Sequence, residues 1–367
     1  MVSFHQTYMA RALQLAERGL FTTDPNPHVG CVIVQNNQVI GEGWHQRAGE
    51  PHAEINALNA AGEHAQNADC YVTLEPCSHF GRTPPCADAL IKAGVKRVYI
   101  AMQDPNPQVA GQGIAKLKEA GIEVVVGILE NEAEQLNKGF CKRMRTGRPF
   151  VRSKLAMSLD GRTAMATGES KWITGPAARQ DVQKLRAQSS AIMTGTGTLL
   201  ADDPSLTVRP EGNWYPDQQS IRQPLRIVVG KDPIVPEYAH LFDDPYQVLF
   251  VTTKKRERGN VVDVLTVPEK KGHVDLNTMM MVLATRGINE IMVEAGSTLN
   301  GALLSAGLID ELIIYMAPKI MGDSAKGLFH LPELQTMAQN IDLDITDIRA
   351  VGNDWRITAV PNYKKVG

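Results

Sequence analysis

Residues 97–126, RVYIAMQDPNPQVAGQGIAKLKEAGIEVVV, show a strand, a helix and a second strand in succession. The apolar runs at 97–102 and 122–126 have the length of buried strands, and residues 112–120 between them have helical spacing. Upstream, a strand at 70–74 is followed by another helix. This alternation predicts an α/β domain in which helices cover a sheet.

The same kind of pattern continues on both sides of this stretch. Residues 204–245 are the exception, because they contain seven prolines and little periodicity, and we expect long loops there. The other predicted elements are, in the first half, helices at 4–16, 52–62, 86–93 and 130–145 and strands at 29–34 and 38–44 joined by a turn at Asn36-Asn37; in the second half, strands at 150–156, 190–194, 225–230, 247–252, 290–293 and 311–316 and helices at 176–187, 275–286 and 298–306.

A breaker-rich stretch divides the chain into two parts. The 367 residues are enough for about two domains. Thr146-Gly147-Arg148-Pro149 follows the predicted helix at 130–145 and contains both glycine and proline. We therefore expect a first domain at 1–145, a linker at 146–149 and a second domain at 150–367.

Composition narrows the possible partners and locations. Lys and Arg total 38 against 40 Asp and Glu, so no broad basic field is available to bind nucleic acid. No apolar stretch approaches the roughly 18 residues of a membrane span, and the first residues, with acidic Glu17, do not resemble a targeting peptide. The five cysteines are too few for a disulfide framework. We expect a cytoplasmic protein that acts on small molecules and binds neither nucleic acid nor membrane.

Three side chains in the first half form a candidate zinc site. His52 lies at the start of a predicted helix, Cys77 follows the strand at 70–74, and Cys86 begins the next helix. One histidine and two cysteines leave a tetrahedral zinc one position for water, which is the pattern of a catalytic site. Glu54, two residues from His52, is the candidate base that takes a proton from that water and returns it to a leaving amine.

Two other interpretations of these residues remain open from spacing alone. The cysteines could be ordinary buried thiols, or Cys70 could complete a closed structural site. In addition, eight residues, Ser78 to Pro85, separate Cys77 from Cys86, whereas zinc deaminases usually have two.

The first half resembles the deaminase domain of the bifunctional riboflavin-biosynthesis deaminase-reductases. The resemblance is carried by DPNPHVG at 24–30, HAE at 52–54 and EPCSHFGRTPPC at 75–86, and the long loop between the cysteines is typical of that family. It implies a cytidine-deaminase-like α/β/α fold and Zn²⁺-dependent removal of the 2-amino group of 2,5-diamino-6-(5-phosphoribosylamino)pyrimidin-4(3H)-one. The resemblance further implies that this substrate is bound by Asn26, His45, His79 and Arg82.

The second half contains two glycine turns that follow predicted strands. Gly195-Thr196-Gly197 is only a partial match to a dinucleotide-binding turn, because Leu200 stands where a third glycine is expected. Gly296-Ser297-Thr298 is better placed, since the N-terminus of the helix that follows offers free N–H groups to a phosphate.

As a set, KLAMSLDG at 154–161, SKWITG at 170–175, the run at 193–204 and VEAGSTL at 293–299 are similar to the reductase domain of the same family. This implies a dihydrofolate-reductase-like α/β fold, NADPH as cofactor, and reduction of the ribosyl group of 5-amino-6-(5-phosphoribosylamino)uracil to ribityl. By resemblance, the cofactor is bound by Ala156, Trp172, Thr198, Asp202, Gly296, Ser297, Thr298, Leu299, Asn300, Gly301 and Ala302, and the substrate by Lys154, Ser170, Arg186, Leu206, Arg209 and Glu294.

The residue types of the second half suggest a phosphate-binding site, and two alternative functions of the chain remain open. Ser170, Arg186 and Arg209 suit a phosphate clamp, because guanidinium forks match phosphate oxygens. One alternative is a tRNA or nucleoside deaminase with an unrelated C-terminal part; another makes the second domain a non-catalytic nucleotide sensor. The long loop between the cysteines and the lack of a basic stripe speak against the first. We also expect a homodimer formed through an exposed sheet edge.

Overall fold

The computed structural model describes residues 4–79, 84–216, 220–231, 236, 238–254 and 262–363. The chain forms two compact units, and the division between them falls between Gly147 and Arg148. None of the described helices combines the length and the apolar character that a membrane span requires.

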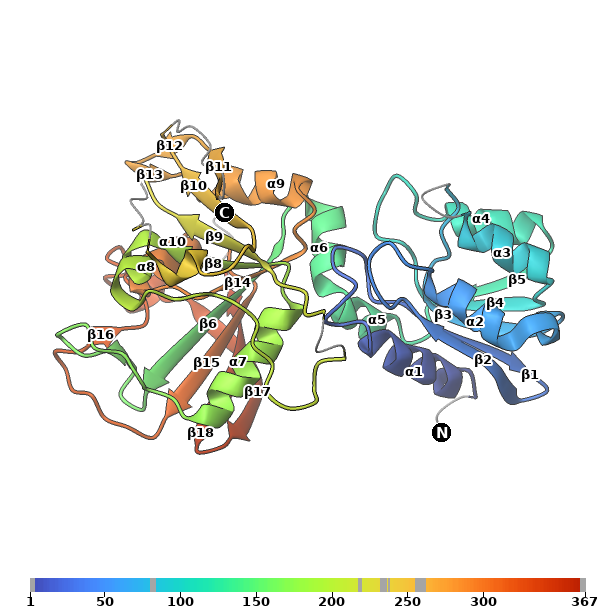
Figure 1. Ribbon diagram of the computed structural model, residues 1–367, viewed down its shortest axis with the longest axis horizontal. Coiled ribbons are helices and arrows are strands. Elements are labelled where there is room, and N and C mark those ends of the chain that lie inside the picture. Colours follow the sequence, from blue (N-terminus) through green and yellow to red (C-terminus); the bar gives the residue numbers. More distant parts are fainter. Residues whose placement is uncertain are drawn as a thin grey trace. The chain divides into compact units, whose positions relative to one another are not determined.

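The first unit is a five-stranded sheet with helices on both faces (Figure 1). The strand order is β2-β1-β3-β4-β5, in which β1 is antiparallel to both of its neighbours and β3, β4 and β5 are parallel. Helices α1 and α5 pack on one face, and α2, α3 and α4 form the layer on the other. The elements are α1 (Phe4–Glu17), β1 (Gly30–Gln35), β2 (Gln38–Trp44), α2 (Ala53–Ala61), the 3₁₀ turn η1 (Gly62–Ala65), β3 (Asp69–Leu74), α3 (Cys86–Ala93), β4 (Arg97–Met102), α4 (Gln112–Glu119), β5 (Glu123–Val126), α5 (Glu130–Leu136) and α6 (Lys138–Thr146).

Two local features of β1 and β2 fix them in the sheet, and the first of them, the turn at Asn36-Asn37, was predicted. Asn36 and Asn37 have φ of 50° and 63°, so they form the turn between these strands with the left-handed backbone that asparagine tolerates. On β2, a Cβ at Gly43 would lie 2.4 Å from the carbonyl oxygen of Ala53. Only glycine permits this close approach, which brings the start of α2 directly onto the sheet.

The predicted helix at 130–145 is wrong in one respect, because it is broken into α5 and α6 at Asn137. The Asn137 amide is buried and pairs with the backbone of His28: its Oδ1 accepts from the His28 N–H at 2.7 Å and its Nδ2 donates to the His28 carbonyl at 2.9 Å. The backbone of Asn137, with φ of −116°, departs from helical geometry. The apolar periodicity continues across the break, so sequence spacing does not reveal it.

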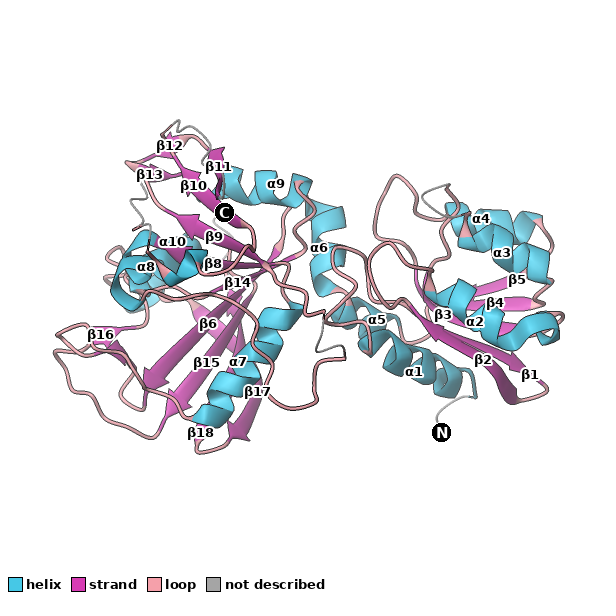
Figure 2. Cartoon of the chain, in the orientation of Figure 1, coloured by secondary structure: helices cyan, strands magenta, loops and turns pink. Residues whose placement is uncertain are grey.

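The second unit is built on a nine-stranded sheet with the order β11-β10-β9-β8-β14-β6-β15-β18-β17 (Figure 2). The strands from β11 to β15 are parallel, and β18 and β17 are antiparallel additions at one edge. Alternate residues of β14 face opposite layers: Ile291 and Val293 pack with α9 and α10, whereas Met292 packs with α7. This two-sided burial explains the continuous apolar run that predicted β14.

The elements of the second unit are β6 (Phe150–Ser158), β7 (Arg162–Ala164), α7 (Pro176–Gln188), β8 (Ala191–Gly195), α8 (Thr196–Asp202), β9 (Leu225–Val229), η2 (His240–Phe242), β10 (Val248–Thr252), β11 (Val262–Thr266), β12 (Glu269–Lys270), β13 (His273–Val274), α9 (Leu276–Thr285), β14 (Glu290–Val293), α10 (Ser297–Ser305), β15 (Glu311–Ala317), β16 (Lys326–Gly327), η3 (Met337–Gln339), β17 (Asp342–Val351) and β18 (Asp354–Asn362). Apart from β9 and the short η2, the described part of 204–245 is loop, as predicted. The sequence pattern missed α8, β11, β17 and β18, and also the short strands β7, β12, β13 and β16.

Candidate zinc centre and dinucleotide cavity

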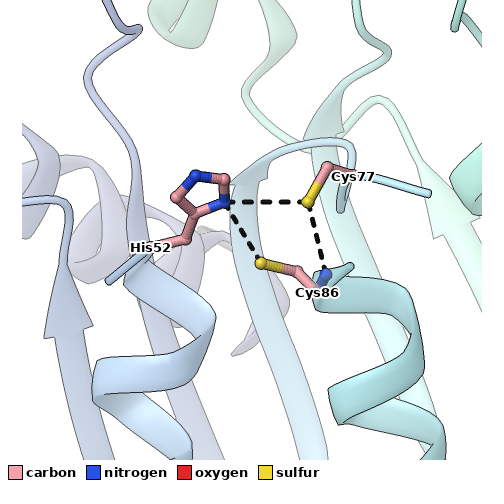
Figure 3. Close-up of side chains that lie close together, drawn as sticks. All are labelled: His52, Cys77 and Cys86. Carbon is pink, nitrogen blue, oxygen red and sulfur yellow. Dashed lines mark hydrogen bonds between the residues drawn. The ribbon is translucent and has the colours of Figure 1, made fainter. Parts of the chain in front are cut away.

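The three candidate ligands come from three different elements of the first unit and converge on one point (Figure 3). His52 is the residue before α2, Cys77 follows β3, and Cys86 is the first residue of α3. Because the starts of both helices lie beside the carboxyl end of the central strand β3, ligands separated by up to 34 positions in sequence become neighbours.

The spacing of the ligand atoms fits a tetrahedral zinc. His52 Nδ1 lies 3.7 Å from Cys77 Sγ and 3.3 Å from Cys86 Sγ. Zn–N and Zn–S bonds of about 2.0–2.1 and 2.3 Å at a tetrahedral angle would hold nitrogen and sulfur about 3.6 Å apart. The two measured distances bracket this value, so the residues fit the metal.

The alternative of a closed site with Cys70 as fourth ligand finds no support. Cys70 is buried in the sheet with its Sγ 3.5 Å from Cys31 Sγ. Among the described residues, the ligand cluster consists of His52, Cys77 and Cys86. Three protein ligands leave one coordination position for water or substrate.

The electrostatics of the cluster suit metal binding and proton transfer. A hydrogen bond from the Cys86 thiol, assisted by His52, lowers the pKa of Cys77 and raises that of Cys86, so that without metal the two sulfurs share one proton and Cys77 is the thiolate. Glu54 lies in the first turn of α2 and is only 3% exposed. Burial raises the pKa of its carboxyl to about 7, although nearby His52 opposes the shift. A carboxyl with this pKa can accept and donate a proton near neutral pH.

Two of the predicted substrate residues of this unit are in contact. Asn26 Nδ2 lies 3.0 Å from His45 Nε2, and His45 Nδ1 lies 3.2 Å from the carbonyl oxygen of Pro51. The ring of His45 also meets the ring of His52 edge-on, with 5.5 Å between centroids. Asn26 and His45 therefore lie beside the metal ligands. His79 is exposed just after Cys77, and Arg82 lies outside the described residues.

Most of the predicted residues of the second unit surround a cavity of about 1080 Å³. The carboxyl ends of β9, β8, β14 and β6 line it, together with the N-termini of α8 and α10. Of the residues predicted to bind cofactor or substrate, those that line the cavity are Lys154, Ala156, Ser170, Trp172, Arg186, Thr198, Asp202, Leu206, Arg209, Glu294, Gly296, Ser297, Thr298, Leu299 and Ala302.

Asn300 and Gly301 do not line the cavity. The buried Asn300 amide donates to the carbonyl oxygens of Ala295 and Gly296 at 2.6 and 3.2 Å, so it shapes the turn before α10. A Cβ at Gly301 would lie 2.2 Å from the carbonyl oxygen of His330, so this glycine permits a close packing contact. Asn300 and Gly301 therefore hold α10 and the turn before it in place without lining the cavity.

An ion-pair cluster on the cavity wall modifies the expected phosphate clamp. Glu294 accepts two bonds from Arg186, at 2.6 and 3.0 Å, and lies 3.2 Å from Lys154 Nζ. Burial opposes ionisation of Glu294, but Arg186 and Lys154 outweigh it and lower its pKa to about 2. Arg186 also donates to the carbonyl oxygen of Thr207. Because its guanidinium already donates to Glu294, Arg186 has fewer N–H groups left to bind a phosphate than the cavity residue Arg209.

The cavity also contains cationic residues that the motifs did not single out. Arg179 lies on α7 seven residues before Arg186, and its guanidinium is 4.7 Å from the ring centroid of Trp172, which is 64% exposed. The i, i+7 spacing, which places Arg179 and Arg186 on one face of the predicted helix, would have indicated that both arginines face the same site. Lys171 and Lys231 line the cavity as well.

Comparison with known proteins identifies the chain. Residues 149–357, more than half of its length, match the family model of the RibD C-terminal domain. The chain belongs to the RibD family. Residues 2–102 match the cytidine and deoxycytidylate deaminase zinc-binding region. We predicted a cytidine-deaminase-like α/β/α domain followed by a dihydrofolate-reductase-like α/β domain. This fold class is confirmed by the match to a deaminase region followed by the RibD C-terminal reductase domain, and the predicted zinc-binding region is confirmed as well.

Relatives within the RibD family match over almost the whole chain. The RibD of Escherichia coli (strain K12) is 57% identical over 359 residues, covering 95% of this chain and 96% of that protein. A RibD structure from Acinetobacter baumannii has 47% identity and a TM-score of 0.92, covering 99% of this chain and 100% of that one. A diaminohydroxyphosphoribosylaminopyrimidine deaminase/5-amino-6-(5-phosphoribosylamino)uracil reductase from Thermotoga maritima has 32% identity and a TM-score of 0.86, covering 98% and 99%.

Proposed function

We propose that this RibD-family chain catalyses two consecutive steps of riboflavin biosynthesis at the two sites described above. The first unit hydrolytically deaminates 2,5-diamino-6-(5-phosphoribosylamino)pyrimidin-4(3H)-one, and the second reduces the ribosyl group of 5-amino-6-(5-phosphoribosylamino)uracil to ribityl. The enzyme uses Zn²⁺ in the first step and NADPH in the second. The convergence of His52, Cys77 and Cys86 next to buried Glu54 is the observation that carries the deaminase assignment.

In the deaminase step, His52, Cys77 and Cys86 would hold the zinc, which activates a water by lowering its pKa. Glu54 takes a proton from this water and delivers it to the departing amine, so that ammonia leaves as a neutral molecule. Its burial disfavours the charged form of the carboxyl, which favours passing the proton on only when an acceptor is at hand. Asn26 and His45, beside the ligands, bind the pyrimidine, and His79 and Arg82 complete the substrate site.

In the reductase step, NADPH supplies the hydride that reduces C1′ of the ribosylamine. The turn at Gly296–Thr298 and the N-terminus of α10 bind cofactor phosphates through the backbone N–H groups of Ser297 and Thr298. Thr198 supports this turn, because its hydroxyl accepts from the Gly296 N–H at 3.0 Å. Ala156, Trp172, Asp202, Leu299 and Ala302 line the rest of the cofactor site, and Asn300 and Gly301 shape it.

The substrate side of the same cavity contains Lys154, Ser170, Arg186, Leu206, Arg209 and Glu294. Arg209 and Ser170 bind the substrate phosphate, while Glu294 holds Arg186 and Lys154 in place. In this assignment, residues 1–145 form the deaminase domain, 146–149 the linker and 150–367 the reductase domain.

We further infer a homodimer formed through the edge of the larger sheet. The edge strand β17 exposes Leu343, Ile345 and Ile348, and its neighbour β18 exposes Trp355. An exposed edge with apolar side chains is a site for pairing with another chain. The ligands are small phosphoribosylaminopyrimidines, and we expect no nucleic acid or membrane partner. A cytoplasmic location is consistent with five unpaired cysteines and with a need for NADPH.

The function is tested with purified protein, the diaminopyrimidinone phosphoribosylamine and NADPH. Ammonia release and the loss of NADPH absorbance are followed together. Ammonia release followed by NADPH oxidation is the expected result. NADPH that is bound but not oxidised, in the presence of the deaminated intermediate, would instead make the second domain a nucleotide sensor.

A further inference from the structure

Glu75 is a buried carboxylate that accepts four backbone hydrogen bonds. Its Oε2 accepts from the N–H groups of Asp104 at 3.1 Å and Gly111 at 2.9 Å. Its Oε1 accepts from Gly113 at 2.9 Å and Ile114 at 3.3 Å. The side chain is 5% exposed. Four converging N–H dipoles therefore stabilise the charge of Glu75.

Three of these donors belong to the beginning of α4. Gly111 is the residue before the helix, and Gly113 and Ile114 lie in its first turn. These N–H groups have no partner within the helix, and the positive end of the helix dipole favours a carboxylate. Glu75 thus caps α4 from the end of β3, and its fourth bond ties down the start of the loop between β4 and α4.

The peptide that follows Glu75 carries a predicted zinc ligand. Pro76 is pressed against α4, because a Cβ at Gly113 would lie 2.0 Å from the Pro76 carbonyl oxygen. On the other side, the carbonyl oxygen of Cys77 accepts from the Ala87 N–H of α3 at 3.1 Å. The Cys86 N–H donates to Cys77 Sγ at 3.3 Å. Cys77 is therefore held between the N-termini of two helices, and Glu75 makes the attachment to α4.

We propose that Glu75 is a positioning residue of the zinc site. By fixing the Glu75–Cys77 turn to α4, its carboxylate sets the position of Cys77 Sγ relative to His52 and Cys86. Residues that hold metal ligands in place are typically worth 10–100-fold in metal affinity or activity. The inference rests on the proposed ligand set His52, Cys77 and Cys86.

The test compares E75Q with the wild-type holoenzyme. Glutamine has the size of glutamate, but its NH₂ group would face N–H donors that need an acceptor. Zinc release to a chromogenic chelator should become at least about 10-fold faster. In the Co²⁺-substituted protein, the ligand-field absorption bands should shift, because the thiolate geometry changes. For deamination, kcat should fall while KM changes little, and NADPH-dependent reduction should be unaffected.

Asp275→Asn provides a matched control. Asp275 caps α9 in the second unit, where its side chain accepts from the Asn277 N–H at 3.2 Å. This variant also removes a carboxylate from a helix N-terminus, but far along the chain from the zinc ligands. Its zinc release and Co²⁺ spectrum should equal those of the wild type.

The outcomes separate the inference from the proposed function. Wild-type protein without bound zinc would refute the ligand set itself. Wild-type zinc retention and an unchanged Co²⁺ spectrum in E75Q would overturn the role of Glu75 alone. If E75Q loses its circular dichroism signal, E75D, which keeps the charge on a shorter side chain, takes its place. Faster zinc release from folded E75D supports the inference, and loss of fold in both variants reduces Glu75 to a purely structural residue.

Discussion

The side chains of Asn26 and His45 form a hydrogen bond whose direction is fixed by a third group. The Pro51 carbonyl can only accept, so the proton of neutral His45 lies on Nδ1, 3.2 Å from that oxygen. Nε2 is then an acceptor, and Asn26 Nδ2 donates to it at 3.0 Å. Burial lowers the pKa of His45, which keeps the ring neutral. The Asn26 carbonyl is thereby turned away from His45 and is available to a donor on the substrate.

His45→Ala should weaken deamination without releasing zinc. The change leaves an Asn26 N–H without its acceptor, which costs about 1–3 kcal/mol, or roughly 5- to 150-fold in kcat/KM. Steady-state ammonia release and zinc analysis measure the two effects. His64→Ala, a substitution of a histidine in the turn η1, is the control and should behave as wild type. Unchanged kcat/KM in H45A would remove His45 from the substrate site.

Glu54→Gln should keep zinc and lose deamination. General acid–base catalysis contributes roughly 10²–10⁴-fold, and Glu54 transfers protons in more than one step. Cys86→Ala, in contrast, should lose both zinc and deamination. Reduction of supplied 5-amino-6-(5-phosphoribosylamino)uracil should continue in both variants. Turnover of E54Q near the wild-type rate would exclude Glu54 as the proton carrier.

Glu294→Gln should destabilise the protein in a pH-dependent way. The folded-state pKa of Glu294 is about 2, below the usual 4.5 of a glutamate, so its ionisation stabilises the fold above pH 4.5. A shift of this size corresponds to about 3 kcal/mol, which is lost as the pH falls from 4.5 towards 2. Urea unfolding should show a large difference in the free energy of unfolding between wild type and E294Q at pH 7, and a smaller difference at pH 3. An equal difference at both pH values would contradict the ion-pair interpretation.

Ile345→Lys should weaken the proposed dimer. Ile345 is 58% exposed on β17, so lysine is accommodated in the monomer, whereas a charge in a paired edge opposes association. Sedimentation velocity should show a shift from dimer to monomer with unchanged circular dichroism. A substitution outside this edge, Tyr238→Lys, at a residue 85% exposed, is the control. A wild-type protein that sediments as a monomer would refute the dimer.

The sequence predicted what is local and missed what depends on distant contacts. His52, Glu54, Cys77 and Cys86 lie within short motifs, and the alternation of apolar runs predicted both sheets. The break at Asn137 depends on the backbone of His28, 109 residues earlier in the chain. Likewise, the pairing of Arg186 with Glu294 spans 108 residues and changed our expectation for the phosphate clamp.

The edge strand β17 was missed from the sequence for a different reason. Polar and apolar residues alternate from Asp342 to Ile345, but this alternation is short and is interrupted by the irregularity between Ile345 and Asp347. Nearly all residues of the strand are exposed, so no buried face extends the pattern. The helix α8 was missed for another reason, because Gly195 and Gly197 indicated a turn where the chain continues directly from β8 into a short helix.

The separate anchoring of the two cysteine ligands has a consequence for how this family can diverge. Cys77 is fixed at the end of β3 and Cys86 at the start of α3, so neither depends on the eight residues between them for its place. Insertions or deletions in that segment can therefore accumulate without moving the metal. If His79 and Arg82 bind the substrate as proposed, changes in this segment alter substrate preference while the metal ligands stay in place.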